Sequence, residues 1–435
     1  MLIFNSDGHH RNVKETQSKT LLSMGEKAES GCYSDYDMWN ILLLPFVVKY
    51  LVAPQLWDND LKDEKFTGSD KCPACFGTSL CEEFMDGNLR LVSYSKFRFF
   101  DFVNIKNVYE GIYNYENVVL KRLGHNTEFE TFDRDICKNA KLQPDCDVSM
   151  AIPASHLGKL NDKDGLTPQD VTGLSDLVRC PSQRLLDRIW NIYEAEKPVD
   201  GILSAENKIM LMVILAFNPE PLTTQVFSQS NGWPFPKFIG SCGRFVVLEN
   251  VGKSLFYYYS EPWQIRVDFA YQAFAIAEKF TNNEEDFALY MTDVTYENFA
   301  VNAKDELMMV DVENVIVVDK KQINQDKPPR WDEKLQSVHD DCIDKHNCLS
   351  FSPNDLCSRV EADHNYYAVC HGILWTEASI PGKPNGLLHD IPEYVKESAE
   401  LVKLLEECQN PSLQYGRFST APQLLFLLQK LAKRI

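Results

Sequence analysis

Short apolar runs predict that the first half of the chain contains antiparallel strands. Residues 1–38 are polar and of mixed charge, which is typical of a weakly structured segment. From Leu89 to Leu123, short runs rich in β-branched and aromatic residues alternate with polar positions, as in successive antiparallel strands. The last of these strands runs from Asn117 to Leu123. Residues 234–251 predict two further strands that lead to a hinge near Glu249.

Helical spacing of apolar residues dominates the second half of the chain. The segment from Ser204 to Ala216 has a serine at the N-cap position and a strong apolar face, and its helical pattern ends near Pro219. An amphipathic pattern covers residues 264–281, and further helical patterns follow at 366–375, 392–408 and 422–434. Strands followed by helices predict an α+β protein with a β-rich N-lobe and a helical C-lobe.

Between the helical patterns at 264–281 and 366–375, two short apolar segments predict a hairpin with carboxylates at both ends. The segments Phe299–Val301 and Leu307–Val310 flank an Asn-Ala-Lys-Asp turn. Asp293 is followed five residues later by Asn298, and Asp311 comes thirteen residues after that. In protein kinases, an Asp, an Asn and an Asp at this spacing accept the substrate hydroxyl proton and hold the metal. We therefore predict Asp293 as the base and Asn298 and Asp311 as metal ligands; the alternative is a hairpin with solvated acidic ends.

A lysine and a glutamate upstream complete the predicted nucleotide site. Lys121, in the strand from Asn117 to Leu123, stands where kinases have the lysine that reaches the α and β phosphates of ATP. Glu206, in the first turn of the following helix, is the candidate for the glutamate that pairs with this lysine. The alternative for Glu206 is an ordinary first-turn glutamate that interacts favourably with the helix dipole. The predicted cofactor is ATP with Mg or Mn.

Several positions depart from the kinase signature and leave catalysis open. Met291 and Thr292 stand where kinases have His and Arg, and Asp311 is followed by Val-Glu instead of Phe-Gly. Residues 101–110 contain no glycine, although a glycine-rich loop would place backbone amides around the phosphates there. These departures argue against efficient ATP handling.

Composition and charge limit the classes of partner. The 435 residues are 44% hydrophobic and 11% aromatic, as in a globular protein with a substantial core. The chain has 63 acidic and 44 basic residues and a net charge of −19, which disfavours nucleic acid and anionic membranes as main partners. A protein substrate or a receptor is the expected partner.

Thirteen cysteines, clustered along the chain, indicate disulfides and an oxidising compartment. One cluster contains Cys72, Cys75 and Cys81, and others lie at residues 137–146 and 342–370. Cys72 and Cys75 also have the spacing of half a zinc site, but no second half follows at zinc-finger spacing. Zinc and free thiols are therefore the less favoured alternatives.

The apolar run from residue 41 to residue 53 bears on localisation. It is shorter than the roughly 20 residues of a membrane span but has the length of a signal-peptide core, although a basic flank is missing. One alternative is that this run is a signal or an anchor, and the other is that it is a buried helix. Membrane association is expected only in the first case.

We divide the chain into an N-terminal region (1–65), a kinase-like N-lobe (66–250) with an insertion (124–200), and a C-lobe (251–435) with a cysteine-rich segment (342–370).

Several long and rare strings stand out along the chain: Lys71-CPACFGTS, VVLKRLG at 118–124, CPSQRLLDR at 180–188, AFNPEPL at 216–222, NFAV at 298–301, DHNYYAVC at 363–370 and YGRF at 415–418. These strings resemble the divergent protein kinase domain family, in particular the branch called divergent protein kinase domain 2 or deleted-in-autism. The resemblance covers about residues 66–420 and implies a two-lobed kinase-like fold, disulfides, and residence in the Golgi or the secreted fraction. It also implies that the kinase-type positions are Lys121, Glu206, Asp293, Asn298 and Asp311.

Three functions are compatible with these observations. The first is a secretory-pathway kinase that transfers the γ-phosphoryl group of ATP to a protein hydroxyl with the help of Mg or Mn. The second is a pseudokinase that acts as a secreted signalling ligand or a Golgi scaffold, which the substituted motifs favour. The third is transfer of a different part of ATP, such as AMP, because a fold does not fix the chemistry.

Overall fold

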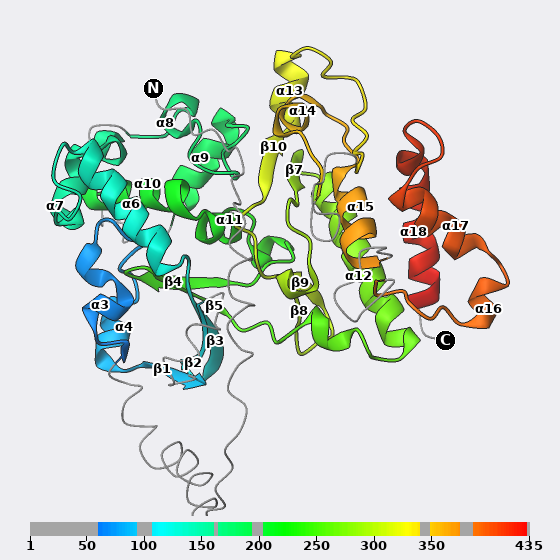
Figure 1. Cartoon of the computed structure of the whole chain (residues 1–435), viewed down its shortest axis with the longest axis horizontal. Coiled ribbons are helices and arrows are strands. Elements are labelled where there is room, and N and C mark those ends of the chain that lie inside the picture. The colour runs from blue at the N-terminus through cyan, green and yellow to red at the C-terminus, as the bar shows by residue number, and fades with distance from the viewer. Residues whose placement is uncertain are drawn as a thin grey trace, which may run out of the picture. The chain divides into compact units, whose positions relative to one another are not determined.

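The computed structural model in Figure 1 describes residues 60–93, 107–160, 164–193, 203–339, 349–374 and 386–432. The apolar run at 41–53, the segment 101–106, Cys342 and Cys348 lie outside the described residues. Leu61 is buried, and the helix α3 (Glu64–Thr67) begins before the predicted lobe boundary at residue 66. The N-terminal region of the prediction therefore extended a few residues into the folded lobe.

The N-lobe contains one five-stranded antiparallel sheet of strand order β1-β2-β3-β5-β4. Its strands are β1 (Leu89–Ser93), β2 (Val108–Tyr113), β3 (Glu116–Arg122), β4 (Phe238–Cys242) and β5 (Phe245–Glu249). Lys121 of β3 is paired with Val108 of β2 and Val246 of β5. The predicted antiparallel strands are thus confirmed, and Lys121 lies within the sheet.

Two consecutive helices pack beside this sheet. Ser204 caps α10 (Ala205–Phe217), and its side chain accepts a hydrogen bond from the amide of Asn207, as the sequence predicts. The chain then bends, and α11 (Glu220–Val226) follows. Among the described residues, no single helix is long and apolar enough to cross a membrane, and only the pair of α10 with residues 220–231, bent by 105°, has that length and composition.

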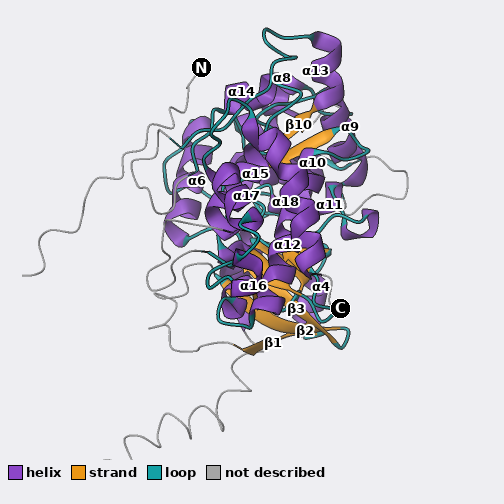
Figure 2. Ribbon diagram, turned by 90° about the vertical axis from the view of Figure 1, so that its right-hand side faces the viewer, coloured by secondary structure: helices purple, strands orange, loops and turns teal. Residues whose placement is uncertain are grey.

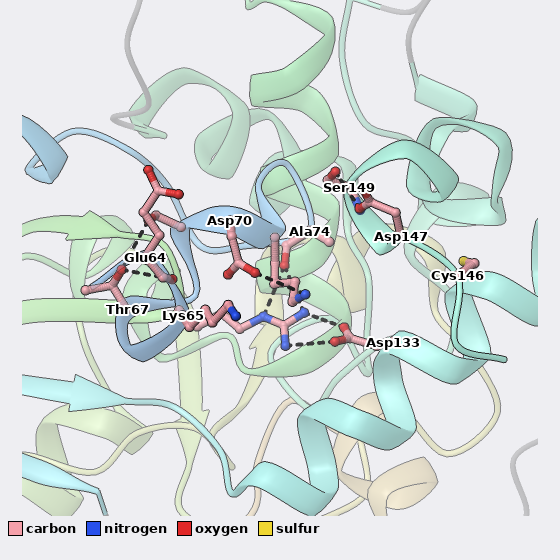
Figure 3. Close-up of polar contacts among 12 residues, drawn as sticks. Glu64, Lys65, Thr67, Asp70, Ala74, Asp133, Cys146, Asp147 and Ser149 are labelled. Carbon is pink, nitrogen blue, oxygen red and sulfur yellow. Dashed lines mark hydrogen bonds and ion pairs between the residues drawn. The ribbon is translucent and has the colours of Figure 1, made fainter. Parts of the chain in front are cut away.

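The insertion begins with helices that belong to the N-lobe. They are α6 (Asn126–Asn139), α7 (Val148–Ala151), and α8 (Pro168–Val171). The buried Arg244, in the turn between β4 and β5, forms an ion pair with Asp133 of α6 and donates to the carbonyl of Ala74 at 3.3 Å. Figure 3 labels Ala74 and Asp133, and dashed lines mark the ion pair at the Asp133 carboxylate. Arg244 therefore attaches the insertion to the sheet.

The end of the insertion also contacts the other lobe, which the predicted division did not include. Arg184 of α9 (Gln183–Ile192) donates to Asp319 at 3.0 Å, and a disulfide joins Cys180 to Cys357. Arg188 of the same helix forms an ion pair with Glu285. Arg188 also donates to the carbonyl of Val226 in α11 at 2.6 Å, so this end of the segment 124–200 contacts both lobes.

The C-lobe is built around the long helix α12 (Trp263–Thr281), against which α15 and α18 pack. Figures 1 and 2 show these helices grouped together. The helices that follow are α13 (Lys320–Asp326), α14 (Pro353–Ser358), α15 (His364–Val369), α16 (Glu393–Lys396), α17 (Glu400–Gln409) and α18 (Gly416–Ala432).

Two small sheets connect α12 to the other helices of this lobe. One pairs β7 (Phe287–Tyr290) with β10 (Ile316–Asp319), and the other has the order β6 (Lys253–Ser254), β8 (Phe299–Val301), β9 (Leu307–Met309). The predicted hairpin is therefore present, with its second strand one residue shorter than expected. Together with the sheet of the N-lobe, these elements form the predicted α+β, two-lobed, kinase-like fold.

Five disulfides join cysteines within the described residues, which confirms the prediction of disulfides for the cysteines at 72–81 and 137–146 and for Cys357 and Cys370. The pairs are Cys72–Cys75, Cys81–Cys242, Cys137–Cys146, Cys180–Cys357 and Cys370–Cys408. Cys72 and Cys75 are bonded to each other, so the zinc interpretation of this spacing is wrong.

Candidate functional site

Lys121 reaches from the N-lobe sheet to the end of the β8–β9 hairpin. Its Nζ lies 2.7 Å from Oε1 of Glu220 and donates to the carbonyl of Val310 at 2.6 Å. The side chains of Lys121 and Glu220 are only 13% and 2% exposed, so this is a buried ion pair. Burial alone would lower the pKa of Lys121, but Glu220 and Asp311 raise it above its ordinary value. The lysine therefore keeps its positive charge.

The predicted partner of this lysine, Glu206, is wrong. Glu206 is exposed in the first turn of α10, and the glutamate that binds Lys121 is Glu220, in the first turn of α11. The reason is the bend of 105° between the two helices, which follows the interruption of the helical pattern at Pro219. Glu206 instead occupies the favourable first-turn position that was its alternative interpretation.

The peptide groups of Val310 bring the predicted site residues together. The Val310 carbonyl accepts from Lys121, while its amide donates to the backbone carbonyl of Asn298 at 2.8 Å. Asp311 follows directly, and the side chain of Asn298 is buried and donates to the carbonyl of Asp293 at 3.4 Å. Lys121 and Asn298, which lie far apart in the sequence, thus both bind the backbone of Val310, next to Asp311.

A third carboxylate, that of Glu313, lies near Lys121 in addition to those of Glu220 and Asp311. Burial raises the pKa of Glu313 to about 7, and the nearby charges of Asp311 and Glu220 contribute to this rise. Asn218 contacts both glutamates, because its amide donates to Glu313 while its Oδ1 accepts from the Glu220 backbone at 3.0 Å. One lysine therefore faces three carboxylates. The net negative charge of this site attracts cations more strongly than it attracts a polyphosphate without a bound metal.

The loop of residues 291–298, which contains Asp293 and Asn298, is held by α15 through the backbone of Met291. The Met291 amide donates to Oδ1 of Asn365 at 3.0 Å, and Nε2 of His364 lies 2.8 Å from the Met291 carbonyl. Asn365 also donates to the carbonyl of Leu289 at 3.0 Å. Both α15 side chains are fully buried, and burial lowers the pKa of His364 to about 4. The loop is thus positioned although the His of the kinase signature is a methionine here.

The remaining contacts orient the ends of this loop. Thr292, which replaces the Arg of the signature, donates from Oγ1 to the carbonyl of Asn314 at 2.6 Å and so joins the loop to the segment after Asp311. Asp293 is exposed, in contrast to the buried Asn298. An exposed carboxylate beside a fixed backbone can meet a hydroxyl of a macromolecular substrate.

The donors present fit a magnesium or manganese ion bound with a nucleotide. Among the described residues, no group of three or more His, Cys, Asp or Glu is arranged to hold a metal by itself. Magnesium bound with a nucleotide needs only one or two protein carboxylates, because phosphate oxygens and water complete its six ligands. Asp311 with the amide oxygen of Asn298 is such a donor set, so the residues would suffice for a metal that arrives with ATP.

The sequence patterns did not single out several residues that build this site. They are Asn218, Glu220, His364, Asn365 and Arg417, whose guanidinium binds Asp363 at 2.6 Å beneath α15. All five lie within the strings AFNPEPL, DHNYYAVC and YGRF on which the family resemblance rests. These strings are long and rare, so the family resemblance was the feature of the sequence that could have pointed to these residues.

Fold and site together define a protein-kinase-like protein, and comparisons with known proteins agree. The family description "Protein-kinase domain of FAM69" matches residues 212–411. The chain is 45% identical over 405 residues to Divergent protein kinase domain 2A of Homo sapiens, which covers 89% of this chain and 94% of that protein. The Xenopus tropicalis protein of the same name is 47% identical over 385 residues, covering 86% and 90%. Divergent protein kinase domain 2B of Homo sapiens is 31% identical over 296 residues, covering 63% and 66%. The chain belongs to the divergent protein kinase domain family.

Proposed function

We propose that this protein binds ATP together with Mg or Mn and transfers the γ-phosphoryl group to a protein hydroxyl in the secretory pathway. The observation that carries the proposal is the buried contact of Lys121 with Glu220 and the Val310 carbonyl, beside Asp311. Keeping a charged lysine in a buried site costs free energy, which a purely structural role would rarely require.

Each residue takes a role that its surroundings allow. Lys121 would bind the α and β phosphates and is held for this by Glu220, while Asp311 and Asn298 would hold the metal. The metal supplies charge neutralisation of the phosphates when bound. Asp293, exposed at the end of the fixed loop, would accept the proton of the attacking hydroxyl.

A second candidate function is that of a pseudokinase acting as a secreted signalling ligand or a Golgi scaffold. Glu313 favours it, because this residue adds a carboxylate next to Asp311 where kinases have glycine. The replacement of the loop His and Arg by Met291 and Thr292 favours it as well. In this case the site would be a remnant that stabilises the fold, and biological activity would not depend on Asp293.

A product analysis separates the two functions. The full chain, made in an oxidising compartment, is incubated with manganese ATP and candidate protein acceptors, and the modified product is identified by mass. We expect a phosphoryl adduct that Asp293→Asn abolishes and the matched control Asp305→Asn preserves, because both side chains are exposed and only the first lies on the loop. An adenylyl adduct would assign AMP transfer instead. Equal activity of Asp293→Asn and wild type in a biological assay, with no adduct, would establish the pseudokinase.

Localisation in the secretory pathway is supported by the chemistry of the cysteines. Five disulfides, two of which join residues more than 160 positions apart, form and persist in oxidising compartments. The full chain expressed in animal cells should appear in the Golgi and the medium with these disulfides formed. Retention in the cytosol with reduced cysteines would contradict this part of the proposal.

A further inference from the structure

The helix α11, which carries Glu220, is too short to be stable without contacts to other elements. It has seven residues, and all of them are buried. The carbonyl groups at the end of an α-helix have no partner within the helix, and that of Val226 is one of them. Arg188 of α9 donates to this carbonyl at 2.6 Å. A positive charge at the C-terminal end of a helix also interacts favourably with the helix dipole.

The same guanidinium is fixed to the C-lobe. The other terminal nitrogen of Arg188 forms an ion pair with Glu285, just before β7, and the second oxygen of Glu285 accepts from Nε1 of Trp233 at 3.0 Å. Arg188 also lies over the ring of Phe227, 5.0 Å from its centroid. Because the side chains of Arg188 and Glu285 are only 20% and 32% exposed, water and salt screen this ion pair less than a surface pair.

The chain that follows α11 packs on the C-lobe as well. The rings of Phe227 and Phe287 of β7 have their centroids 5.8 Å apart, and those of Trp233 and Phe280 of α12 are 6.0 Å apart. These aromatic contacts bury a large apolar area around the ion pair of Arg188. The end of α11 is therefore held from the C-lobe, although its place in the sequence is in the N-lobe.

Lys121 reaches the site from the opposite side. Its strand β3 lies within the N-lobe sheet, and its Nζ donates to Glu220 of α11 and to the carbonyl of Val310 in the C-lobe. A displacement of α11 would therefore move Glu220 away from Lys121 and would not carry the two residues along together. Since a hydrogen bond weakens within a few tenths of an ångström, this contact depends on where α11 is fixed.

We propose that Arg188 is a positioning residue of the candidate site, which fixes α11 to Glu285 so that Glu220 meets Lys121. The importance of this for ATP rests on the proposed function, whereas the positioning of Glu220 does not. The guanidinium suits the task because its nitrogens point in fixed, different directions, one to the Val226 carbonyl and one to the carboxylate.

The test is the reactivity of Lys121 towards an amine-acetylating reagent, measured by mass spectrometry of the full chain without nucleotide. In wild type the neighbouring carboxylates raise the pKa of Lys121, and its side chain is only 13% exposed, so its acetylation should be slow. Arg188→Gln should speed acetylation about threefold or more, because each unit by which the lysine pKa falls gives about ten times more neutral amine. Glu285→Gln keeps the shape of the carboxylate and should act in the same direction, which tests the connection even if Arg188→Gln fails to fold.

The matched control is Arg179→Gln, just before α9. Arg179 forms its ion pair with Asp176 within its own turn, and its side chain is more exposed than that of Arg188, so Lys121 should react as in wild type. Hydrogen exchange adds a second measurement: in Arg188→Gln the amides of residues 222–227 should exchange about tenfold faster, the effect of losing a charged hydrogen bond. The amides of β3 and β5 should change by less than about twofold, whereas a general loss of stability would speed both groups.

Wild-type reactivity of Lys121 in both Arg188→Gln and Glu285→Gln would overturn the proposal. An equal rise at lysines throughout the chain would overturn it too, because it would show general destabilisation. With manganese ATP, the rise of the unfolding midpoint should be smaller in Arg188→Gln than in wild type. If wild type shows no such rise, the proposed function fails, while the acetylation of Lys121 still decides the role of Arg188.

Discussion

The candidate site has two sides, that of Lys121 and that of the loop of residues 291–298, and the two depart from the kinase signature in different ways. On the lysine side the residue types are kept, but the glutamate that binds Lys121 comes from α11 and not from the capped helix α10. On the loop side the signature His and Arg are lost, yet His364 and Asn365 of α15 hold the Met291 backbone. The comparison shows that the groups of the site can be held in place either by a residue from a different helix or by new side chains that bind the same backbone.

Removing the carboxylate beside Lys121 should have the largest effect. Glu220→Gln leaves a buried ammonium with a weaker partner, and we expect a loss of about 3 kcal/mol or more in the free energy of unfolding. The matched control is Glu206→Gln, which should change stability by less than about 0.5 kcal/mol because that side chain is exposed. Denaturant unfolding measures both; equal effects would show that the Lys121–Glu220 contact contributes nothing particular.

The support of the catalytic loop should appear as a pH dependence. His364 is buried and its folded pKa is about 4, below the value of about 6.5 in an unfolded chain, so the unfolded state binds more protons between these values. The contribution of neutral, buried His364 to the free energy of unfolding is complete above pH 6.5. It falls by about 3 kcal/mol as the pH is lowered towards 4.

A substitution isolates this contribution. His364→Gln should flatten the fall in unfolding free energy between pH 6.5 and pH 4, because glutamine does not titrate. His125→Asn is the control, since His125 is exposed and asparagine also caps a helix. A slope in His364→Gln as steep as in wild type would assign the acid sensitivity to other groups.

The smallest expected change in stability concerns the hydrogen bond that connects the loop of residues 291–298 to the segment after Asp311. Thr292→Val removes the hydrogen bond to the Asn314 carbonyl while keeping the shape of the side chain, and should lower stability by about 1 kcal/mol. Thermal unfolding beside Thr127→Val, at an exposed helix position, measures the difference. An unchanged midpoint in Thr292→Val would show that the two segments are held together by packing alone.

Local patterns were enough to predict several elements but not their partners. The β8–β9 hairpin, the cap of α10 and the strand of Lys121 depend on neighbouring residues, so their sequence signals agree with the structure. The partner of Lys121 could not be chosen this way, because Glu206 and Glu220 both occupy first turns of helices that follow the lysine strand. The bend at Pro219 between these helices distinguishes them, because it places Glu220, and not Glu206, against Lys121.

The same limit applies to the insertion and to the support of the loop. Arg184 and Cys180 looked like features of an N-lobe insertion, but their partners Asp319 and Cys357 lie in the C-lobe. Asn365 showed no motif of its own, and its role follows from the buried amide of Met291 that it satisfies. Contacts between residues more than 70 positions apart produce no local sequence pattern. A single sequence therefore does not reveal such contacts.

The central claim is that Lys121, Glu220 and Asp311 form a working site for ATP with a divalent metal. The most direct measurement is thermal unfolding of the full chain, made in an oxidising compartment, with and without magnesium or manganese ATP. A ligand that binds only the folded state stabilises it by RT ln(1 + [L]/Kd), so a metal-dependent rise of the midpoint is expected. The rise should disappear in Asp311→Ala and persist in the control Asp305→Ala. No shift at millimolar nucleotide, or a shift that Asp311→Ala retains, would contradict the claim and favour the pseudokinase.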